Sequence, residues 1–570
     1  MYPRRLLLIL LPLCLLIGGC SFAPEVSEPT NPATPTTRPT VLVPDVVLPG
    51  VTVPPEETDH TGPKNTDLTF PAGPAGELTD FFGFNHIWNH TCVLAPDALT
   101  EGGLRTEQMG CRVLKIYLTN YYDANYTAVS WPQKRYASPA ELADSPPYRK
   151  LFAMDIDTFV IGTYLFSNEF GHCATYFADQ FPEKARELEY RQMYELTYYL
   201  CKAYAGTGKT FILQNWESDW SCLPYSEDRG YPDEAVFERL IRWCNTRQDA
   251  VTAARRDAGC EGVYVYHALE VNLVVDGIEG HPCVTRDVVP YTYCDYYSYS
   301  AYDSQSTDET FAAALDYLLA QVAANRTGGR SRCYIGEFGF SNAVPVAQSC
   351  ALVDRVFRIA REKGLSYALL WHLTVETADL NTDTGFWLVD PTGEYHPLWN
   401  YLYRLLHNGA DDPAYLAALE ARRSVTVLRW APETLTQYRS GQIKLVNIPY
   451  DGAAGLQEYQ GRICAVSDPA ADQIYLYFNA DDLPLEKVRD LRIRVTVWDE
   501  KPFPLSLQYN STSSIASAQT VMTKGSGGFA EYIFTLRDAD FATRLQSMAD
   551  FRLYANGRNM QVAEIVIEKP

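Results

Sequence analysis

From Leu68 to about residue 422, short apolar runs alternate with stretches whose apolar residues recur at helical spacing. Apolar runs bounded by turn residues are typical of buried strands, and the helical stretches between them can connect parallel neighbours. A chain of this kind favours repeated strand–helix units and a parallel sheet. The strands that we expect cover residues 81–85, 113–118, 158–163, 210–214, 263–266, 296–299, 333–335 and 367–371. Eight such units over roughly 350 residues predict a (β/α)8 barrel, the TIM-barrel class of α/β folds, across residues 67–422.

After residue 422 the period of the pattern changes. Every second residue from Leu491 to Val497 is apolar, and we expect further strands at 474–478, 505–509, 532–536 and 562–567. A period of two indicates strands with one buried face, and many short strands of this kind are typical of a β-sandwich. We therefore expect a β-sandwich accessory domain over residues 423–570. We expect Trp498 and Tyr509 to be exposed, which suits either carbohydrate binding or bracing of the barrel.

The first residues have the pattern of a targeting signal. Arg4 and Arg5 precede the apolar stretch 6–17, which is too short to span a bilayer. The run Ile-Gly-Gly-Cys that ends at Cys20 resembles the lipobox of bacterial lipoproteins, which implies a signal peptide over 1–19 and a lipid on Cys20. The alternative is an ordinary secretory signal with a chance cysteine. We expect an extracytoplasmic protein at the cell membrane or cell surface, with the Pro- and Thr-rich residues 20–66 as a tether.

Composition restricts the partners of the chain. The formal net charge of −22 repels phosphate backbones, so we expect no nucleic-acid role. The 39 tyrosines and 10 tryptophans suit stacking on sugar rings, although they also fill cores. His86 and His90 are four residues apart without a third ligand, and no CxxC pair occurs. We expect no metal, no cofactor and a monomer.

Two glutamates follow strands that lie opposite each other in the predicted barrel. Glu337 comes after the seventh strand in the run Cys-Tyr-Ile-Gly-Glu-Phe-Gly, and Glu217 follows the fourth strand. The carboxyl ends of the strands carry the active site in barrels of this class. We therefore predict that these two carboxylates face each other across the mouth of the barrel.

These motifs resemble those of clan A of the glycoside hydrolases, the cellulase-like retaining enzymes. The resemblance covers roughly residues 80–406 and implies that Glu337 is the nucleophile and Glu217 the acid/base. Two carboxyls about 5–5.5 Å apart would then give retention through a glycosyl-enzyme. Trp371 in the run Ala-Leu-Leu-Trp-His-Leu resembles the tryptophan that floors the sugar subsite in the clan, and Asn85 after the first strand is expected to contact substrate.

The sequence departs from the clan at two positions. The clan places an asparagine directly before the acid/base, whereas here Trp216 separates Asn215 from the glutamate. We retain both Asn215 and Trp216 as expected substrate contacts. On the sixth strand a serine replaces the usual histidine, while Tyr302 is kept and is expected to line the site. Asp219 and Glu270 remain alternative acids, because each also lies near a strand end.

The function that we expect is a retaining glycoside hydrolase that cleaves O-glycosidic bonds of an extracellular polysaccharide or oligosaccharide. We expect this enzyme to use two glutamates in a double-displacement mechanism. The alternative is a catalytically inactive glycan-binding lipoprotein on the same scaffold. A matched pair of strand-end glutamates favours the enzyme, because a pure binder has no need of it. A transglycosylase would use the same pair, and the sequence does not name the sugar or the linkage.

Overall fold

The computed structural model describes residues 43–56, 77–88, 93–126, 131–132, 135–170, 176–223, 230–324, 333–342, 344–374, 385–390, 393–435, 437–446, 454–467, 475–541, 545 and 549–569. The predicted signal peptide, Cys20 and most of the predicted tether lie outside these residues. Within them, we find no helix with the length and apolar character needed to cross a membrane.

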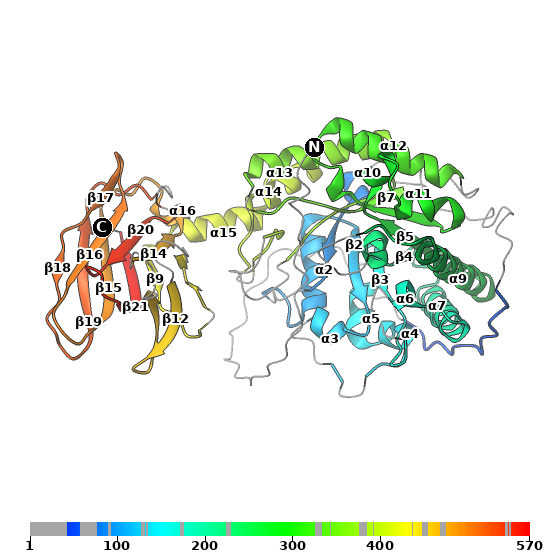
Figure 1. Cartoon of the computed structure of the whole chain (residues 1–570), viewed down its shortest axis with the longest axis horizontal. Coiled ribbons are helices and arrows are strands. Elements are labelled where there is room, and N and C mark those ends of the chain that lie inside the picture. Colours follow the sequence, from blue (N-terminus) through cyan, green and yellow to red (C-terminus); the bar gives the residue numbers. More distant parts are fainter. Residues whose placement is uncertain are drawn as a thin grey trace. The chain divides into compact units, whose positions relative to one another are not determined.

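Eight parallel strands close into a barrel in sequence order, which confirms the predicted fold class (Figure 1). Each strand pairs with the next, and β1 pairs with β8 to complete the ring. The strands are β1 Phe82–His86, β2 Val113–Leu118, β3 Thr158–Thr163, β4 Thr210–Gln214, β5 Tyr264–Val271, β6 Tyr296–Ser300, β7 Cys333–Phe338 and β8 Ala368–Leu370.

Helices follow the strands and pack outside the barrel (Figure 1). The long ones are α2 Ala98–Met109, α7 Glu183–Ala203, α9 Glu234–Ala258, α12 Asp308–Ala324, α13 Val346–Glu362 and α14 Pro397–Leu406. A further helix, α15 Pro413–Arg423, follows α14 and has no buried residue. Shorter helices are α1 Leu78–Phe81, α3 Tyr122–Asn125, α4 Pro139–Ala143, α5 Pro146–Phe152, α6 Tyr176–Asp179, α8 Ser218–Cys222, α10 Val274–Ile278, α11 Val284–Asp287, η1 Val289–Tyr291 and η2 Ala301–Asp303. Local chemistry sets their ends: Asp97 accepts a hydrogen bond from the Thr100 amide at 2.7 Å to begin α2, and Gly110 ends it at φ 80°.

The barrel interior is built in layers. At the amino end of the strands, tyrosines on neighbouring strands interlock edge to face, with ring centroids 5.3–6.1 Å apart: Tyr266, Tyr296, Tyr334 and Tyr367. Edge-to-face contact is a favoured geometry of aromatic pairs. Charged and polar side chains occupy the next layer towards the mouth, among them Lys115, Glu270 and Glu337.

The C-terminal part contains two antiparallel sheets around one apolar core, as predicted for a β-sandwich. One sheet runs β10-β11-β14-β20-β16-β17 with β18 beside β16, and the other runs β12-β13-β21-β15-β19 with β9 beside β21. The bounds are β9 Val427–Trp430, β10 Arg439–Ser440, β11 Ile443–Val446, β12 Ala454–Tyr459, β13 Arg462–Ser467, β14 Tyr475–Ala480, β15 Leu491–Asp499, β16 Pro504–Asn510, β17 Ile515–Ser517, β18 Val521–Met522, β19 Gly528–Leu536, β20 Phe551–Tyr554 and β21 Gln561–Glu568, with one short helix, α16 Asp482–Leu485.

Tyr509, which we expected to be exposed, is buried in the sandwich instead. It occupies the same face of β16 as the core leucines, and its hydroxyl donates to Asp538 at 2.6 Å. Trp498 is half-buried between Tyr459 and Phe529, at centroid distances of 5.5 and 5.3 Å. The expectation of exposure is therefore wrong for Tyr509, because the pleat turns it inward with its alternate neighbours.

Residues 43–56, which we call the strap, lie along the outside of the barrel without helix or strand (Figure 1, dark blue). Four half-buried valines of the strap pack on the barrel core: Val43, Val46, Val51 and Val53. Arginines of α5, α7 and α9 hold the strap by its backbone and by Glu56. Arg149 donates to the Val43 carbonyl at 2.7 Å, Arg186 donates to the Pro54 carbonyl at 2.9 Å, and Arg242 pairs with Glu56 at 2.6 Å. This part of the predicted tether is thus attached to the barrel.

Candidate active site

A β-bulge turns Glu337 into the barrel. Side chains alternate between the two faces of a strand. Because Gly336 faces the barrel interior, Glu337 would point outward if β7 were regular. Against β6, however, Tyr299 pairs with Ile335 while Ser300 pairs with Glu337, which leaves Gly336 as the extra residue. Bulges re-aim side chains in this way and are frequent beside active sites.

Gly336 is required by the layer beneath the site. A Cβ atom there would lie 2.0 Å from Ser298 Oγ and 2.4 Å from Glu270 Oε1. Any side chain at this position would collide with the polar layer. The flanking glycine therefore allows the close packing from which Glu337 emerges.

Glu217 reaches the site from the loop after β4. It lies three residues beyond the strand, at the residue that precedes α8, and has a φ of 21°. Positive φ is uncommon for a residue with a side chain, and such conformations cluster at functional sites. The Glu217 amide donates to Glu270 Oε2 at 3.0 Å, which helps to hold this conformation.

The hydroxyl of Ser300 contacts both glutamates. Its Oγ lies 2.5 Å from Glu217 Oε1 and 3.5 Å from Glu337 Oε2. These two carboxylate oxygens are consequently no more than about 6 Å apart, which suits the roughly 5–5.5 Å of retaining glycosidases better than the roughly 6.5–9.5 Å of inverting ones. The structure therefore brings together the two residues that the sequence singled out.

A buried lysine lies beneath the nucleophile candidate. Lys115, on β2, places its ammonium 2.8 Å from Glu337 Oε1 and 3.1 Å from Glu270 Oε1. Burial alone would lower the pKa of Lys115, but the charges of the two carboxylates raise it above its usual value. Lys115 is therefore positively charged and favours the ionised form of Glu337.

The second glutamate has the opposite electrostatic environment. Burial is the main cause that raises the pKa of Glu217 well above its usual value, and the nearby charge of Glu337 raises it further. The hydrogen bond from Ser300 acts against this shift without cancelling it. Two carboxyls whose environments separate their proton affinities are the arrangement that assigns one as acid and the other as base or nucleophile.

The alternative acids are engaged in the interior. Glu270 is fully buried and accepts hydrogen bonds from Gln214 at 3.0 Å and Ser298 at 2.8 Å, in addition to its pairing with Lys115. Asp219 is also buried and accepts from three backbone amides, of Val284 at 2.7 Å, Asn272 at 2.9 Å and Leu273 at 3.2 Å. Both carboxylates organise loops and strands around the site.

Asn215 and Asn85 use their amides within the protein. Asn215 Nδ2 donates to Ser218 Oγ at 2.7 Å and to the Trp216 carbonyl at 3.1 Å, and its Oδ1 accepts from the Glu270 amide at 3.3 Å. The Nδ2 of Asn85 donates to the Gly336 carbonyl at 3.1 Å. The Oδ1 of Asn85 is buried without a partner among the described residues. The structure thus places Asn85 beside the bulge and engages the side-chain amide of Asn215 within the protein.

The predicted aromatic contacts are half-buried around the mouth. Trp371 follows β8 and meets the edge of Trp88 at a centroid distance of 6.3 Å, and Trp88 in turn meets Tyr117 at 6.0 Å. Tyr302 lies in η2 after β6 and packs edge to face on Phe386. These rings form apolar walls against which a sugar could lie.

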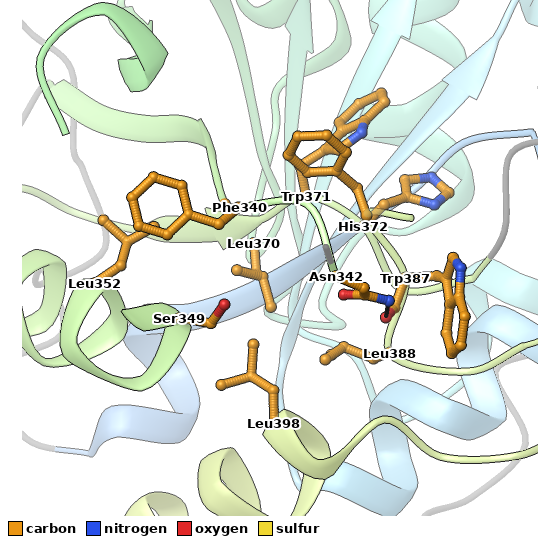
Figure 2. A pocket seen from close by; sticks show the side chains of 12 residues that line it. Phe340, Asn342, Ser349, Leu352, Leu370, Trp371, His372, Trp387, Leu388 and Leu398 are labelled. Atoms are coloured by element: carbon orange, nitrogen blue, oxygen red, sulfur yellow. Dashed lines mark hydrogen bonds between the residues drawn. The ribbon is translucent and has the colours of Figure 1, made fainter. Parts of the chain in front are cut away.

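Trp216 is half-buried directly before Glu217, and its backbone amide donates to the Tyr164 hydroxyl at 2.5 Å. A small pocket lies beside Trp371, between the end of β8 and helices α13 and α14 (Figure 2). Phe340, Leu370 and Leu398 make it largely apolar, and neither site glutamate lines it. It adjoins the candidate site through Trp371 and through Phe386, on which Tyr302 packs.

Sequence reasoning missed Lys115 and Tyr117. Both belong to β2, where they project inward on alternate positions, and the charges of both site glutamates act on the Tyr117 hydroxyl. Burial is the main reason that the pKa of Tyr117 lies well above its usual range. A single lysine within the apolar run Val-Leu-Lys-Ile-Tyr-Leu was the available signal.

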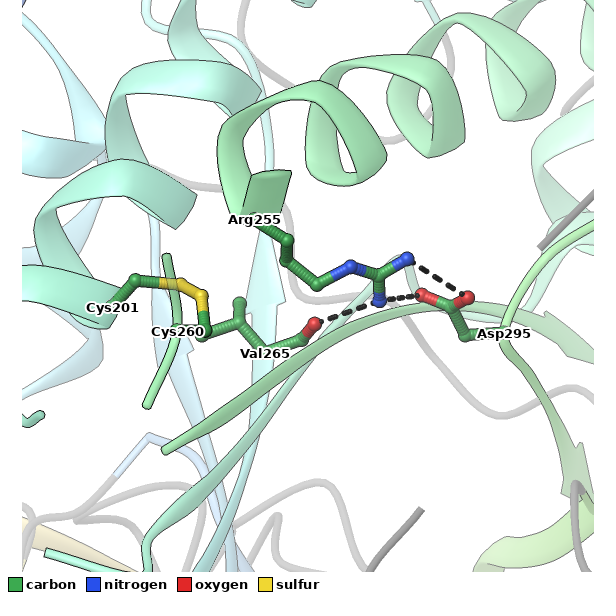
Figure 3. The surroundings of a disulfide bond; sticks show 5 residues. All are labelled: Cys201, Arg255, Cys260, Val265 and Asp295. Atoms are coloured by element: carbon green, nitrogen blue, oxygen red, sulfur yellow. Dashed lines mark hydrogen bonds and ion pairs between the residues drawn. A yellow bond between two sulfur atoms is a disulfide. The ribbon is translucent and has the colours of Figure 1, made fainter. Parts of the chain in front are cut away.

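Two cysteines of the barrel are joined to each other. Cys201 at the end of α7 and Cys260 after α9 form a disulfide, beside which Arg255 pairs with Asp295 at 2.6 Å (Figure 3). Arg255 also donates to the Val265 carbonyl at 2.9 Å, which ties α9 to β5. Among the described residues, no three His, Cys, Asp or Glu side chains are grouped as metal ligands.

No protein-family model matches the sequence, and no curated protein matches it. Three solved structures show a likeness of fold. A calcium-binding mutant of beta-glucuronidase 2 from Bacteroides uniformis is 9% identical with a TM-score of 0.34, over 87% of this chain and 65% of that one. A Bacteroidetes-affiliated GH5 cellulase linked with a polysaccharide utilization locus is 15% identical with a TM-score of 0.37, over 60% and 95%.

The third structure is the exo-beta-1,4-mannosidase Op5Man5 from Opitutaceae bacterium strain TAV5, 14% identical with a TM-score of 0.38, over 59% of this chain and 60% of that one. This chain thus spans less than two thirds of the glucuronidase and of the mannosidase. All three are glycoside hydrolases by name. At these TM-scores the likenesses do not bear on the activity of this chain.

Proposed function

We propose that the chain is a retaining glycoside hydrolase that acts on an extracellular polysaccharide or oligosaccharide. The observation that carries the proposal is the Ser300 hydroxyl within 3.5 Å of both buried glutamates. That spacing leaves room for an anomeric carbon to be attacked by one carboxylate while the other reaches the leaving oxygen.

In the first step, Glu337 attacks the anomeric carbon and forms an ester, while protonated Glu217 gives its proton to the departing glycosidic oxygen. Lys115 favours the ionised form of the attacking carboxylate, and the raised pKa of Glu217 favours the proton donor. In the second step, ionised Glu217 takes a proton from water, whose oxygen displaces Glu337 with net retention.

Ser300 supports this division of roles. A serine hydroxyl has one proton and can accept as well as donate. When Glu217 is protonated it can donate to the Ser300 oxygen, and the serine proton can then point to Glu337. After the first step Glu217 is ionised and accepts from Ser300 instead.

The test begins with a panel of aryl glycosides and plant polysaccharides, followed by labelling with the 2-deoxy-2-fluoro form of the glycoside that is cleaved. We expect the label on the peptide that contains Glu337 and none on Glu337→Gln. For Glu337→Ala we expect a loss on the order of 10⁴-fold, about 5 kcal/mol, and with azide an inverted glycosyl azide.

For Glu217→Ala we expect a loss of about 10²–10⁴-fold on poor leaving groups and a smaller loss on activated aryl glycosides. Azide should restore this variant and give a retained glycosyl azide. Full activity of Glu337→Ala would refute the assignment. Azide rescue of Asp219→Ala, with Glu217→Ala fully active, would transfer the acid role to Asp219.

We further propose that Cys20 carries a lipid that anchors the enzyme to a membrane, on the basis of the Ile-Gly-Gly-Cys run. Two acyl chains suffice for stable anchoring. Cys20→Ala should therefore move the protein from the membrane fraction to the soluble fraction. An unchanged membrane fraction would contradict the proposal.

A further inference from the structure

The outer face of one sheet of the β-sandwich carries an aromatic surface. Alternate residues of β14, β20 and β16 point into the core, so the residues between them point away from it. The strand register places these outward residues in two rows across the sheet. We call them the tyrosine platform: Tyr475, Tyr554 and Ser506 in one row, and Tyr477, Arg552 and Gln508 in the next.

Two tyrosines lie side by side in the first row of this platform. Tyr475 and Tyr554 are directly paired across β14 and β20, with ring centroids 5.0 Å apart and planes inclined by 33°. Both are half-buried, so part of each ring meets solvent. Tyr477 beside them is fully buried and packs with Leu545 and Ala549. The platform is therefore bounded on one side by buried Tyr477 and partly accessible at two adjacent tyrosines.

An immobilised arginine lies among these rings. The Arg552 guanidinium is 3.9 Å from the centroid of the Tyr475 ring, which is cation–π contact. Its Nε donates to Gln508 Oε1 at 2.7 Å, and its Nη1 donates to the Tyr477 hydroxyl at 2.5 Å. A side chain held at three points has little rotamer freedom left to lose when a ligand binds, which favours binding.

The outer face of the other sheet has a different character. Ion pairs cross it, with Arg494 to Glu531 at 2.9 Å, Arg494 to Glu568 at 3.1 Å and Arg429 to Glu564 at 2.6 Å. A face whose charges are already paired within the sheet has little to offer a neutral ligand. The other face also holds the rings of Trp498, Tyr459 and Phe529. The two outer faces thus differ in their charged groups, because ion pairs cross one face while the tyrosine platform combines its rings with one arginine and neutral polar groups.

A pyranose ring has an apolar C–H face rimmed by hydroxyls, which matches a flat phenol ring beside amide and guanidinium groups. Two adjacent tyrosines extend such a surface beyond a single sugar. We propose that the tyrosine platform binds a neutral polysaccharide chain through sugar rings stacked on Tyr475 and Tyr554, with hydroxyl contacts near Gln508. The binding itself does not depend on the proposed function. Only the further statement that the bound polymer is also the substrate of the enzyme rests on the proposed function.

Binding is separated from hydrolysis in a Glu337→Gln background. The full-length protein is run in native gels that contain barley β-glucan, konjac glucomannan or xylan. We expect retardation in at least one gel, and an apparent affinity at least tenfold lower after Tyr475→Ala and Tyr554→Ala are added. Tyr554→Phe should retain the affinity, because it keeps the ring and removes only the hydroxyl.

Tyr459→Ala is the matched control, since it removes a half-buried tyrosine from the opposite sheet. We expect it to leave retardation unchanged, and the thermal midpoints of all variants confirm that they are folded. In the active protein, the platform variants should hydrolyse small aryl glycosides within about twofold of the wild-type rate. Loss of that activity together with binding would indicate a folding defect and would overturn the proposal.

Retardation in none of the three gels, or equal retardation with and without the two tyrosines, would also overturn the platform. An equal loss of affinity in Tyr459→Ala would do the same. If the wild-type protein hydrolyses no substrate but shows retardation that depends on the two tyrosines, the proposed catalytic function is refuted and the proposed binding by the platform is supported. The two proposals can thus fail separately.

Discussion

Lys115→Met tests the electrostatic account of the site most directly. The ammonium of Lys115 is fully buried and lies 2.8 Å from Glu337 and 3.1 Å from Glu270. Breaking a buried ion pair by removal of one partner costs about 3–5 kcal/mol, because the remaining charge is left uncompensated. Methionine keeps much of the length and apolar bulk of the lysine stem, so the change removes mainly the charge.

Two carboxylates share this loss. If about half of it falls on Glu337, the pKa of the nucleophile rises by roughly 1–2 units, since one unit corresponds to about 1.36 kcal/mol. A protonated nucleophile cannot attack, so the acid limb of the kcat/KM profile should move to higher pH by that amount. The basic limb, which follows the proton on Glu217, should move less because Lys115 acts on it only weakly.

The assay is the pH dependence of kcat/KM on the aryl glycoside that is cleaved best. Lys209→Met is the matched control, because Lys209 is also buried but donates to the Met154 and Ile156 carbonyls at 2.8 and 2.7 Å. It should lower stability without moving either limb. An acid limb that stays in place in Lys115→Met would show that this lysine does not set the ionisation of Glu337.

Burial lowers the pKa of His86 to about 4 and that of His372 to about 3. Because the unfolded chain binds these protons more readily, the free energy of unfolding present above about pH 6.5 should fall by about 2–3 kcal/mol per histidine by pH 4.5. An unchanged Tm between about pH 7.5 and 4.5 would contradict this. Loss of the Cys201–Cys260 disulfide, with a sequence separation of 59, should cost about 4 kcal/mol in urea unfolding, and equal midpoints for the wild type and the double serine variant would argue against it. Gly336→Ala places a Cβ 2.0 Å from an oxygen of the layer below and should reduce kcat on the order of 10²-fold; wild-type kcat would refute the role of the bulge.

The barrel could be predicted because most of its strands are continuous apolar runs. The expected ranges for β2, β3 and β4 agree with the structure, since their buried faces are almost wholly apolar. β5 was expected to end at residue 266 but continues to Val271. The second half of β5 carries Glu270 inside the barrel. A charged residue in a sequence normally indicates that a buried strand has ended, so the continuation of β5 could not be predicted.

The candidate site could be predicted in its two glutamates and in the rings of Trp371 and Tyr302, but not in the layer that supports them. Position after a strand identified Glu337 and Glu217, but no sequence pattern shows that Gly336 is a bulge within β7 and not a turn after it. The contacts of Asn215 depend on a loop conformation that propensities do not specify. Lys115 was hidden because its charge is compensated by residues more than 150 positions away.

The strap bears on the order in which the chain folds. Residues 43–56 are made early, yet the partner of Glu56 on α9 follows 186 positions later, and the partner of Pro54 on α7 follows 132 positions later. At a synthesis rate of about 5–20 residues per second, the strap waits on the order of ten seconds or more before its docking surface exists. Residues near the start of the described chain therefore reach their final positions only after much of the barrel has been made.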